Sequence, residues 1–372
     1  MPDEDITVEA GALAPPSART HVGTGRPVTR LRLDLMGVPL GFAAVAQCYS
    51  ASRQVLPGLP MWSINVWWLA SAAIATVMAA ACIVDVLTHS SFAVEARDAT
   101  LGPFLALTPI LLMVYGPAVG VHAESAGRVV FLLGLGSLAA FGSWLSGWWI
   151  VGDVRLERWH PGYLLPTAIG GLVAAGSGAL LGYRSLALLA YGWGLISWLW
   201  IGSIVLVRLA LAAPLPLALT PALAILAAPP AAAADAWLLL GNAPVSAVMG
   251  VLAGCVCLMV GVQLCLIRVL RRVPFGAGWW ALVVSYSTVA AFALDWLARS
   301  PAPLGAQRAS AASLLVAVSV GIAVLAVRST LAMLSLLGRA VLERTEGRPA
   351  APSLIGQIRP RRFDTSRRPK DT

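Results

Sequence analysis

Few side chains in the apolar part of this sequence could carry acid–base or ion-binding chemistry. Asp235 and Asp295 each come late in a long apolar run, and Arg328 lies within the last such run. An ionisable group is costly to bury in apolar surroundings, so these residues are candidates for ion or proton coupling. For the two aspartates the alternative is a shallow, interfacial or salt-bridging role. Arg328 is expected to extend toward the inner surface, where it could attract anions.

Three threonines stand beside prolines inside apolar runs, and their hydroxyls could act in either of two ways. The pairs are Thr108–Pro109, Pro166–Thr167 and Thr220–Pro221. A proline removes a backbone donor and leaves a carbonyl unpaired, which a neighbouring hydroxyl can satisfy. The same hydroxyl could instead donate a hydrogen bond to a passing anion. Both roles stay open at this point.

Neither the histidines nor the cysteines predict a cofactor or a metal site. All four histidines lie in tails or loops, so no pair within an apolar run could ligate haem. The five cysteines are an odd number, and Cys255 and Cys257 point to different faces of a helix. We therefore expect no cofactor, no metal ion, no disulfide network and no catalytic residue, and we predict that the protein is not an enzyme. The histidines are His21, His89, His122 and His160.

Composition identifies the solvent in which these residues work. Of 372 residues, 58% are hydrophobic and only 12% are charged, about half the charged share of a soluble domain. Such a chain belongs in a lipid bilayer, which excludes a secreted disulfide scaffold, a nucleic-acid-binding domain and an ordinary cytosolic enzyme. At about 20 residues per span, the apolar residues suffice for ten transmembrane helices.

The apolar runs predict an all-α polytopic membrane protein with one transmembrane domain over residues 34–337. A polar tail is expected over 1–33, and a basic, disordered tail over 338–372. The ten predicted spans are 34–52, 64–86, 101–121, 128–150, 161–182, 186–207, 216–240, 246–267, 276–298 and 310–335.

The net charge of +9 predicts an orientation rather than a nucleic-acid partner. Arginines gather in the tails and in the connections from even to odd spans, as at Arg97, Arg155 and Arg271. Basic residues are retained in the cytoplasm, so both termini are expected there, in the plasma membrane.

Proline placement separates the spans into two sets, because only the odd-numbered spans contain proline in their interiors. An unpaired carbonyl in hydrocarbon costs several kcal/mol, by the order of magnitude of an unmade hydrogen bond, so kinked helices need protein or water around them. We therefore expect five helical hairpins, with the odd spans around a central pore and the even spans facing lipid. The kink prolines are Pro39, Pro109, Pro166, Pro221, Pro229 and Pro230.

Three stretches on the odd spans carry a family resemblance. They read RWHPGYLLPT over 158–167, LTPALAILAAPPA over 219–231 and PFGAGWWA over 274–281. Residues 34–337 thereby resemble the family of plant slow-type anion channels and microbial tellurite-resistance and C4-dicarboxylate transporters. The resemblance implies ten helices in five hairpins, a central pore in each subunit and a homotrimer.

The ninth span departs from this family at the position of its gate. In the family, a phenylalanine followed by proline plugs the pore, whereas this chain has Val284 and Ser285. The gate could be leakier, could be formed by Tyr286 or another aromatic residue, or could be absent. Val284, Ser285 and Tyr286 are thus the candidate gate residues, beside the three threonines as candidate pore-lining residues.

These features favour an anion channel or transporter that passes halide, nitrate, sulfite, tellurite or C4-dicarboxylate through a pore lined by the odd spans. Its expected partners are small anions, the lipid bilayer and two further copies of the chain, and not nucleic acid. A proton-coupled carrier of a dicarboxylate or another weak acid is the first alternative, with Asp235 or Asp295 carrying the proton. A membrane enzyme or an accessory subunit without transport is the second.

Overall fold

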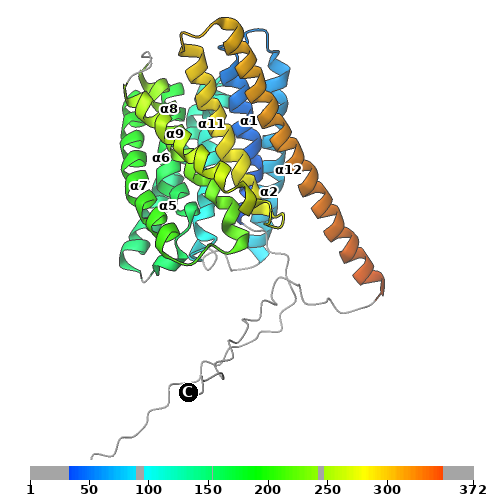
Figure 1. Ribbon diagram of the computed structural model, residues 1–372. Helices are drawn as coiled ribbons and strands as arrows, with labels where there is room; N and C mark the ends of the chain where they lie inside the picture. The colour runs from blue at the N-terminus through cyan, green and yellow to red at the C-terminus, as the bar shows by residue number, and fades with distance from the viewer. Residues whose placement is uncertain (1–32, 89–95, 153, 242–246, 347–372) are drawn as a thin grey trace, which may run out of the picture.

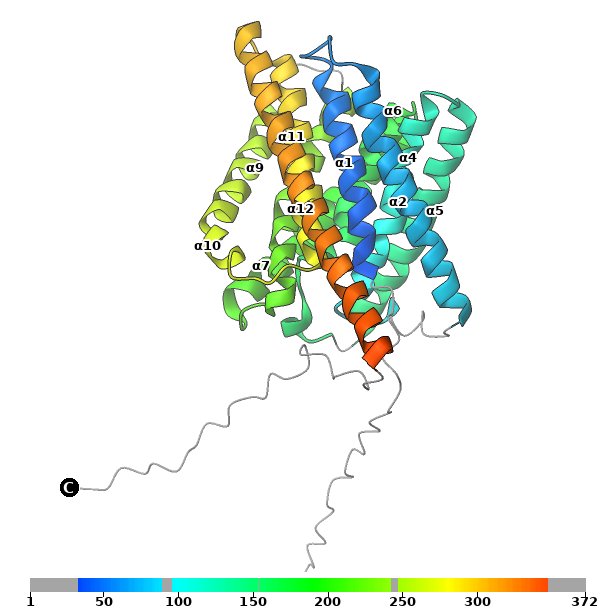
Figure 2. The ribbon, with the colours of Figure 1, turned by 90° about the vertical axis from the view of Figure 1, so that its right-hand side faces the viewer.

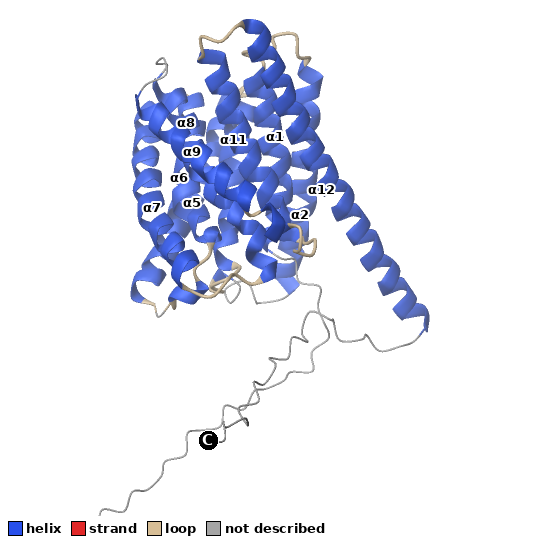
Figure 3. Cartoon of the chain, in the orientation of Figure 1, coloured by secondary structure: helices blue, strands red, loops and turns tan. Residues whose placement is uncertain are grey.

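The computed structural model describes residues 33–88, 96–152, 154–241 and 247–346, and these residues contain helices and loops but no strand (Figure 3). Ten helical segments are long and apolar enough to cross a membrane, as predicted. The predicted tail over 1–33 lies almost wholly outside the described residues. The spans are Asp34–Ser52, Met61–Asp85, Gly102–Gly120, Glu124–Val151, Pro161–Leu180, Arg184–Leu211, Leu217–Gly241, Ala247–Cys265, Ala277–Arg299 and Leu304–Leu336.

The even spans are long regular α-helices, whereas the odd spans begin with 3₁₀ or π geometry before they become α-helical. The even spans are formed by α2 (Met61–Thr88), α5 (Glu124–Val151), α7 (Arg184–Leu211), α9 (Ala247–Cys265) and α12 (Leu304–Glu346), with the short α10 (Ile267–Leu270) after α9. The odd spans are η1 (Leu33–Met36) with α1 (Gly37–Ser52), η2 (Gly102–Ala106) with α4 (Leu107–Gly120), η4 (Pro161–Leu164) with η5 (Leu165–Ile169) and α6 (Gly170–Leu180), η6 (Leu217–Ala227) with α8 (Ala228–Gly241), and η7 (Ala277–Trp279) with α11 (Trp280–Arg299).

The odd spans are the buried ones. In their most apolar stretches 61, 61, 83, 78 and 44% of residues are buried, against 6, 28, 33, 22 and 22% for the even spans. The helices stand side by side with their axes roughly parallel, and α12 lies against α1 and α11 at one edge (Figures 1 and 2). Each odd helix also packs against the even helix that follows it in the chain.

The six prolines are all buried, but most do not kink the middle of a helix. Pro39, Pro109, Pro229 and Pro230 lie within the first three residues of α1, α4 or α8, where a backbone N–H has no partner within the helix anyway. These four prolines therefore stand at the starts of α-helices rather than in their interiors. Pro166 lies in the π segment η5, and Pro221 lies inside the 3₁₀ segment η6.

Polar side chains of even spans satisfy backbone carbonyls of odd spans. Ser71 of α2 donates to the carbonyl of Pro39 at 2.7 Å, and Gln263 of α9 donates to the carbonyl of Leu223 at 2.5 Å. Without water in the bilayer core, irregular backbone is tolerated only where neighbouring protein provides such donors.

Close backbone contact joins α6 to α7. A Cβ added at Gly171 would stand 2.8 Å from the Cα of Gly194, so these two helices can touch only through glycine.

The last helix extends beyond the predicted domain end. Helix α12 continues to Glu346, so residues 338–346 are helical rather than part of a disordered tail. Residues 347–372 lie outside the described residues.

The described chain starts and ends on the same side, at the bottom of Figures 1 and 2. All odd spans therefore run in one direction, and the assignment of that side to the cytoplasm stays a prediction.

Candidate functional site: a cavity among the five odd spans

A cavity of about 260 Å³ lies between the odd spans. All five odd spans contribute to its wall, and no residue of an even span does so within the described part of the chain. From the first span the wall contains Asp34, Gly37, Leu40, Ala44 and Gln47; from the third Thr100, Leu101, Phe104, Leu107, Ile110 and Val114; from the fifth Leu165, Ile169 and Val173; from the seventh Pro216, Ala218, Leu219, Ala222, Ile225, Ala228 and Ala232; from the ninth Ala277, Gly278, Ala281, Val284, Ser285 and Thr288.

The cavity lies toward the side of the membrane domain where the odd spans begin. Its wall starts at the first residues of several odd spans and reaches Gln47 on α1 and Thr288 on α11. From Asp34 to Gln47 a helix rises by about 20 Å at 1.5 Å per residue. Beyond their last lining residues the odd spans continue for about one to three turns without contributing to this cavity.

The irregular backbone coincides with this wall. The π segment η5 contributes Leu165 and Ile169, and the long 3₁₀ segment η6 contributes most of the lining from its span. Long 3₁₀ stretches and π turns are uncommon and recur at functional sites. Several helix N-termini also lie at the wall, including Ala228, the first residue of α8. The partial positive charge of helix N-termini favours anions.

The wall is mostly aliphatic, with few polar groups. Its polar side chains are those of Asp34, Gln47, Thr100, Ser285 and Thr288, and none of the described lining residues is Lys, Arg or His. An anion in this cavity would therefore meet hydroxyl groups, helix dipoles and the carboxyl group of Asp34 rather than a fixed positive charge.

The ninth span contributes Val284 and Ser285 to the wall, as the sequence predicts for pore-lining residues. Ala281 and Thr288 join them, because positions i, i+3, i+4 and i+7 share one face of a helix. Tyr286 lies off this face and is not among the described residues that line this cavity. Thr288 was missed by the sequence analysis, although its spacing from Val284 could have identified it.

The three threonines beside prolines do not line the cavity. Thr108 is exposed, and Thr167 and Thr220 are buried elsewhere. The hydroxyl of Thr220 donates to the carbonyl of Pro216 at 3.4 Å, which is the structural role weighed for it, whereas the hydroxyl of Thr167 is buried without a hydrogen-bond partner. The hydroxyl groups on the wall are those of Thr100, Ser285 and Thr288 instead.

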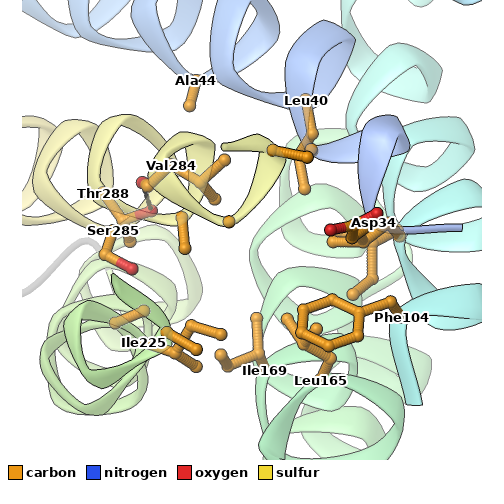
Figure 4. A pocket seen from close by; sticks show the side chains of 18 of the residues that line it. Asp34, Leu40, Ala44, Phe104, Leu165, Ile169, Ile225, Val284, Ser285 and Thr288 are labelled. Carbon is orange, nitrogen blue, oxygen red and sulfur yellow. Dashed lines mark hydrogen bonds between the residues drawn. The ribbon is translucent and has the colours of Figure 1, made fainter. Parts of the chain in front are cut away.

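Phe104 is the only aromatic residue among the described lining residues, and the sequence analysis did not select it. Figure 4 shows Phe104 and Asp34 across the cavity from Val284, Ser285 and Thr288. The Phe104 ring stacks on that of His160, with ring centroids 5.8 Å apart and planes inclined by 13°.

His160 is held in place behind this ring. Its Nδ1 accepts a hydrogen bond from the N–H of Gly162 at 3.2 Å, and only 1% of the residue is exposed. A Cβ at Gly162 would stand 2.6 Å from His160 Cε1 and 3.1 Å from Phe104 Cζ. The stacking of the two rings therefore requires glycine at position 162. Burial lowers the pKa of His160 to about 4, although the backbone of Ala99 and Thr100 partly offsets this effect. The imidazole is therefore neutral near pH 7.

Comparison with known proteins relates this architecture to a family. The sequence pattern of the voltage-dependent anion channel family matches residues 30–334, which contain the first nine spans and nearly all of the tenth. The chain belongs to the voltage-dependent anion channel family. It is also 27% identical over 172 residues to the tellurite resistance protein TehA homolog of Haemophilus influenzae. That match covers 44% of this chain and half of the relative.

In this member of the voltage-dependent anion channel family, the structure brings Asp235 and Asp295 together. The two carboxyls face each other from α8 and α11. Asp295 is 5% exposed and pairs with Arg299 at 3.3 Å, which is the salt bridge expected as one of its alternative roles. Arg328 lies apart on the exposed side of α12, with its guanidinium 5.9 Å from the centre of the Phe275 ring, and does not reach the cavity.

Proposed function

We propose that this protein conducts small anions through the cavity between its odd spans. The observation that carries the proposal is the cavity wall, to which all five odd spans contribute in a chain of this family. A transmembrane domain that serves only as a packed scaffold would not need irregular, proline-containing backbone around a shared space at its centre.

The chemistry of the wall favours monovalent anions that shed water readily. Aliphatic side chains offer little to replace a hydration shell, and a divalent ion loses far more solvation energy than a monovalent one. The Ser285 hydroxyl and the helix N-termini stabilise negative charge weakly, which lets an ion leave as well as enter, whereas the Thr288 hydroxyl already donates to the Val284 carbonyl at 2.9 Å. We therefore expect nitrate and halides to pass faster than sulfite, tellurite or a C4-dicarboxylate.

Phe104 is the proposed constriction of this pathway. The family's plug position holds Val284, which is too small to close a passage alone, and Tyr286 faces elsewhere. The ring of Phe104, supported by His160, lies on the opposite side of the cavity and supplies the aromatic surface that Val284 lacks.

The test is anion flux into liposomes that contain the purified protein. Chloride, nitrate, sulfite, malate and tellurite would be compared by reversal potentials in a reconstituted bilayer, with protein-free liposomes as the control. We expect anion currents with nitrate and chloride ranked above malate. Absence of flux for all five anions would overturn the proposal.

The number of subunits and the orientation in the membrane are also part of the proposal. We expect a homotrimer in the plasma membrane with the Leu33 side in the cytoplasm, supported by the family resemblance and by the distribution of arginines. Native mass spectrometry of the protein extracted with lipid would give the number of subunits, and a monomer would contradict the expected trimer.

A proton-coupled carrier of a weak acid is the second candidate, because a carboxyl pair, with Asp295 buried and Asp235 half-buried, lies between α8 and α11. In that case a pH gradient would accumulate malate against its concentration gradient. Malate that only equilibrates would exclude the carrier and retain the channel.

A further inference from the structure

We propose that Asp235 and Asp295 form a proton-binding site in which the two carboxyls share one proton. The site lies beyond the end of the cavity that is marked by Gln47 and Thr288. The site is independent of which anion passes. Its effect on transport, given below, rests on the proposed function.

Helix geometry places the pair on the faces that line the cavity. Asp235 follows the lining residue Ala232 by three positions, and Asp295 follows Thr288 by seven. Residues three or seven positions apart share a helix face, so both carboxyls lie about 5–10 Å further along the same faces. Gln54 lies in the turn just after α1, which ends at Ser52.

The two carboxyls differ in their hydrogen-bond and ion-pair partners. Asp295 Oδ1 accepts a hydrogen bond from Gln54 Nε2 at 2.7 Å and pairs with Arg299 at 3.3 Å. Asp235 faces the Asp295 carboxyl within hydrogen-bonding reach, and its Oδ1 is buried with no N–H or O–H donor. Two carboxyl groups can hydrogen-bond to each other only when one of them carries a proton.

One added proton neutralises the net charge of the two carboxylates and the neighbouring Arg299. Two carboxylates and Arg299 would leave one net negative charge among partly buried groups, whereas one added proton makes the group neutral. The turn after α1 adds Gln54, and α1 adds the thiol of Cys48, which donates to the Ser287 carbonyl at 2.9 Å. Helix α6 adds the backbone of Gly176 against Ala236. Helix α7 offers Tyr191, whose ring contacts Trp237, and Arg184, which donates to the Leu240 carbonyl. None of these described contacts supplies Asp235 with a second positive charge.

Release of the proton would affect anions directly. The site would then carry a net negative charge about one or two helical turns beyond the cavity, and a like charge close to a low-dielectric pathway raises the barrier for an anion. Anion flux is therefore expected to fall as pH rises through the release of this proton.

Infrared spectroscopy of the purified protein in lipid detects the proton without any transport. A protonated carboxyl has a C=O stretch apart from that of a carboxylate, and the band shifts in D₂O. We expect such a band from a buried acid at pH 7 in the wild type and its loss as pH is raised. Absence of the band at pH 7 overturns the proposal and needs no variant.

Substitutions assign the band. Asp235→Asn and Asp295→Asn should each remove it, because a single carboxyl beside an amide donor and Arg299 can stay ionised. Glu124→Gln is the matched control, since Glu124 is an exposed carboxylate that pairs with Arg128 on α5. A band that survives both aspartate substitutions overturns the assignment.

Flux measurements then test the effect on transport. Wild-type anion flux should fall about tenfold from low to high pH, equivalent to about 1.4 kcal/mol of barrier, while Asp235→Asn should show a flat profile. A wild-type flux independent of pH, with the infrared band present, overturns the effect on anions. A wild type that shows the band but passes no anion at all contradicts the proposed function and leaves the proton site supported.

Discussion

The odd and even spans differ in hydropathy and have opposite structural roles: mean hydropathy is 1.2–1.7 in the most apolar stretches of the odd spans and 1.8–2.4 in those of the even spans. The fifth span is 83% buried in its most apolar stretch, whereas the second is only 6% buried. Even spans are regular α-helices that expose large side chains such as Leu69, Val77 and Leu189. Odd spans contain 3₁₀ and π backbone, and neighbouring protein supplies donors for their carbonyls. In this membrane protein, hydrophobic length indicates which segments cross the bilayer, and higher hydropathy together with backbone regularity indicates which of them meet lipid.

The largest expected effect comes from adding the same ring to each set. Val284→Phe should reduce anion flux at least about tenfold, a change of about 1.4 kcal/mol in barrier height, because the ring narrows the cavity. Val251→Phe, on an exposed face of α9, should leave flux unchanged. Liposome flux at equal protein content measures both. Equal effects of the two substitutions would mean that Val284 does not face the pathway.

Removing the aromatic ring on the opposite wall should act in the other direction. Phe104→Ala is expected to raise flux several-fold, because no other described lining residue is aromatic. Leu105→Ala, one position along and off the wall, is the control. A fall in flux for Phe104→Ala in a protein of normal thermal stability would show that the ring does not constrict the passage.

Acid should weaken the packing around His160. The folded-state pKa of about 4 lies below the unfolded value of 6.5, so the unfolded chain binds the proton first as pH falls. Stability should therefore be lost between pH 6.5 and pH 4, by at most about 3 kcal/mol for this group. Thermal unfolding over this range, compared with His160→Gln, isolates the contribution. An identical pH slope in the variant would contradict the buried neutral imidazole.

The last comparison concerns stability and glycines of the two sets. Gly171→Ala should destabilise the protein by about 1–3 kcal/mol, because a Cβ there would stand 2.8 Å from the backbone of Gly194. Gly192→Ala, where no atom lies within 4 Å of the added Cβ, should leave the melting temperature unchanged or raise it. The reverse order would show that α6 and α7 do not approach as closely as described.

Much of the fold could be predicted from the sequence because bilayer thickness makes hydrophobic length informative. The ten spans and the burial of the proline-containing ones follow from local composition and backbone chemistry. The residues that line the cavity were harder to predict. Val284 and Ser285 were recognised through a motif, but Thr108 and Thr167 were selected as neighbours of prolines, and a neighbour in sequence points to a different face of the helix.

What the sequence by itself determined is the set of ten membrane-crossing helices and their division into regular and irregular spans, since both depend on residues close together in the chain. Only the tertiary structure decided how each helix is rotated about its axis. That rotation turned Tyr286 away, brought Phe104 to the cavity and joined Asp235 to Asp295 across two helices. Rotation depends on packing between distant segments, which no local pattern in an almost uniformly apolar helix encodes.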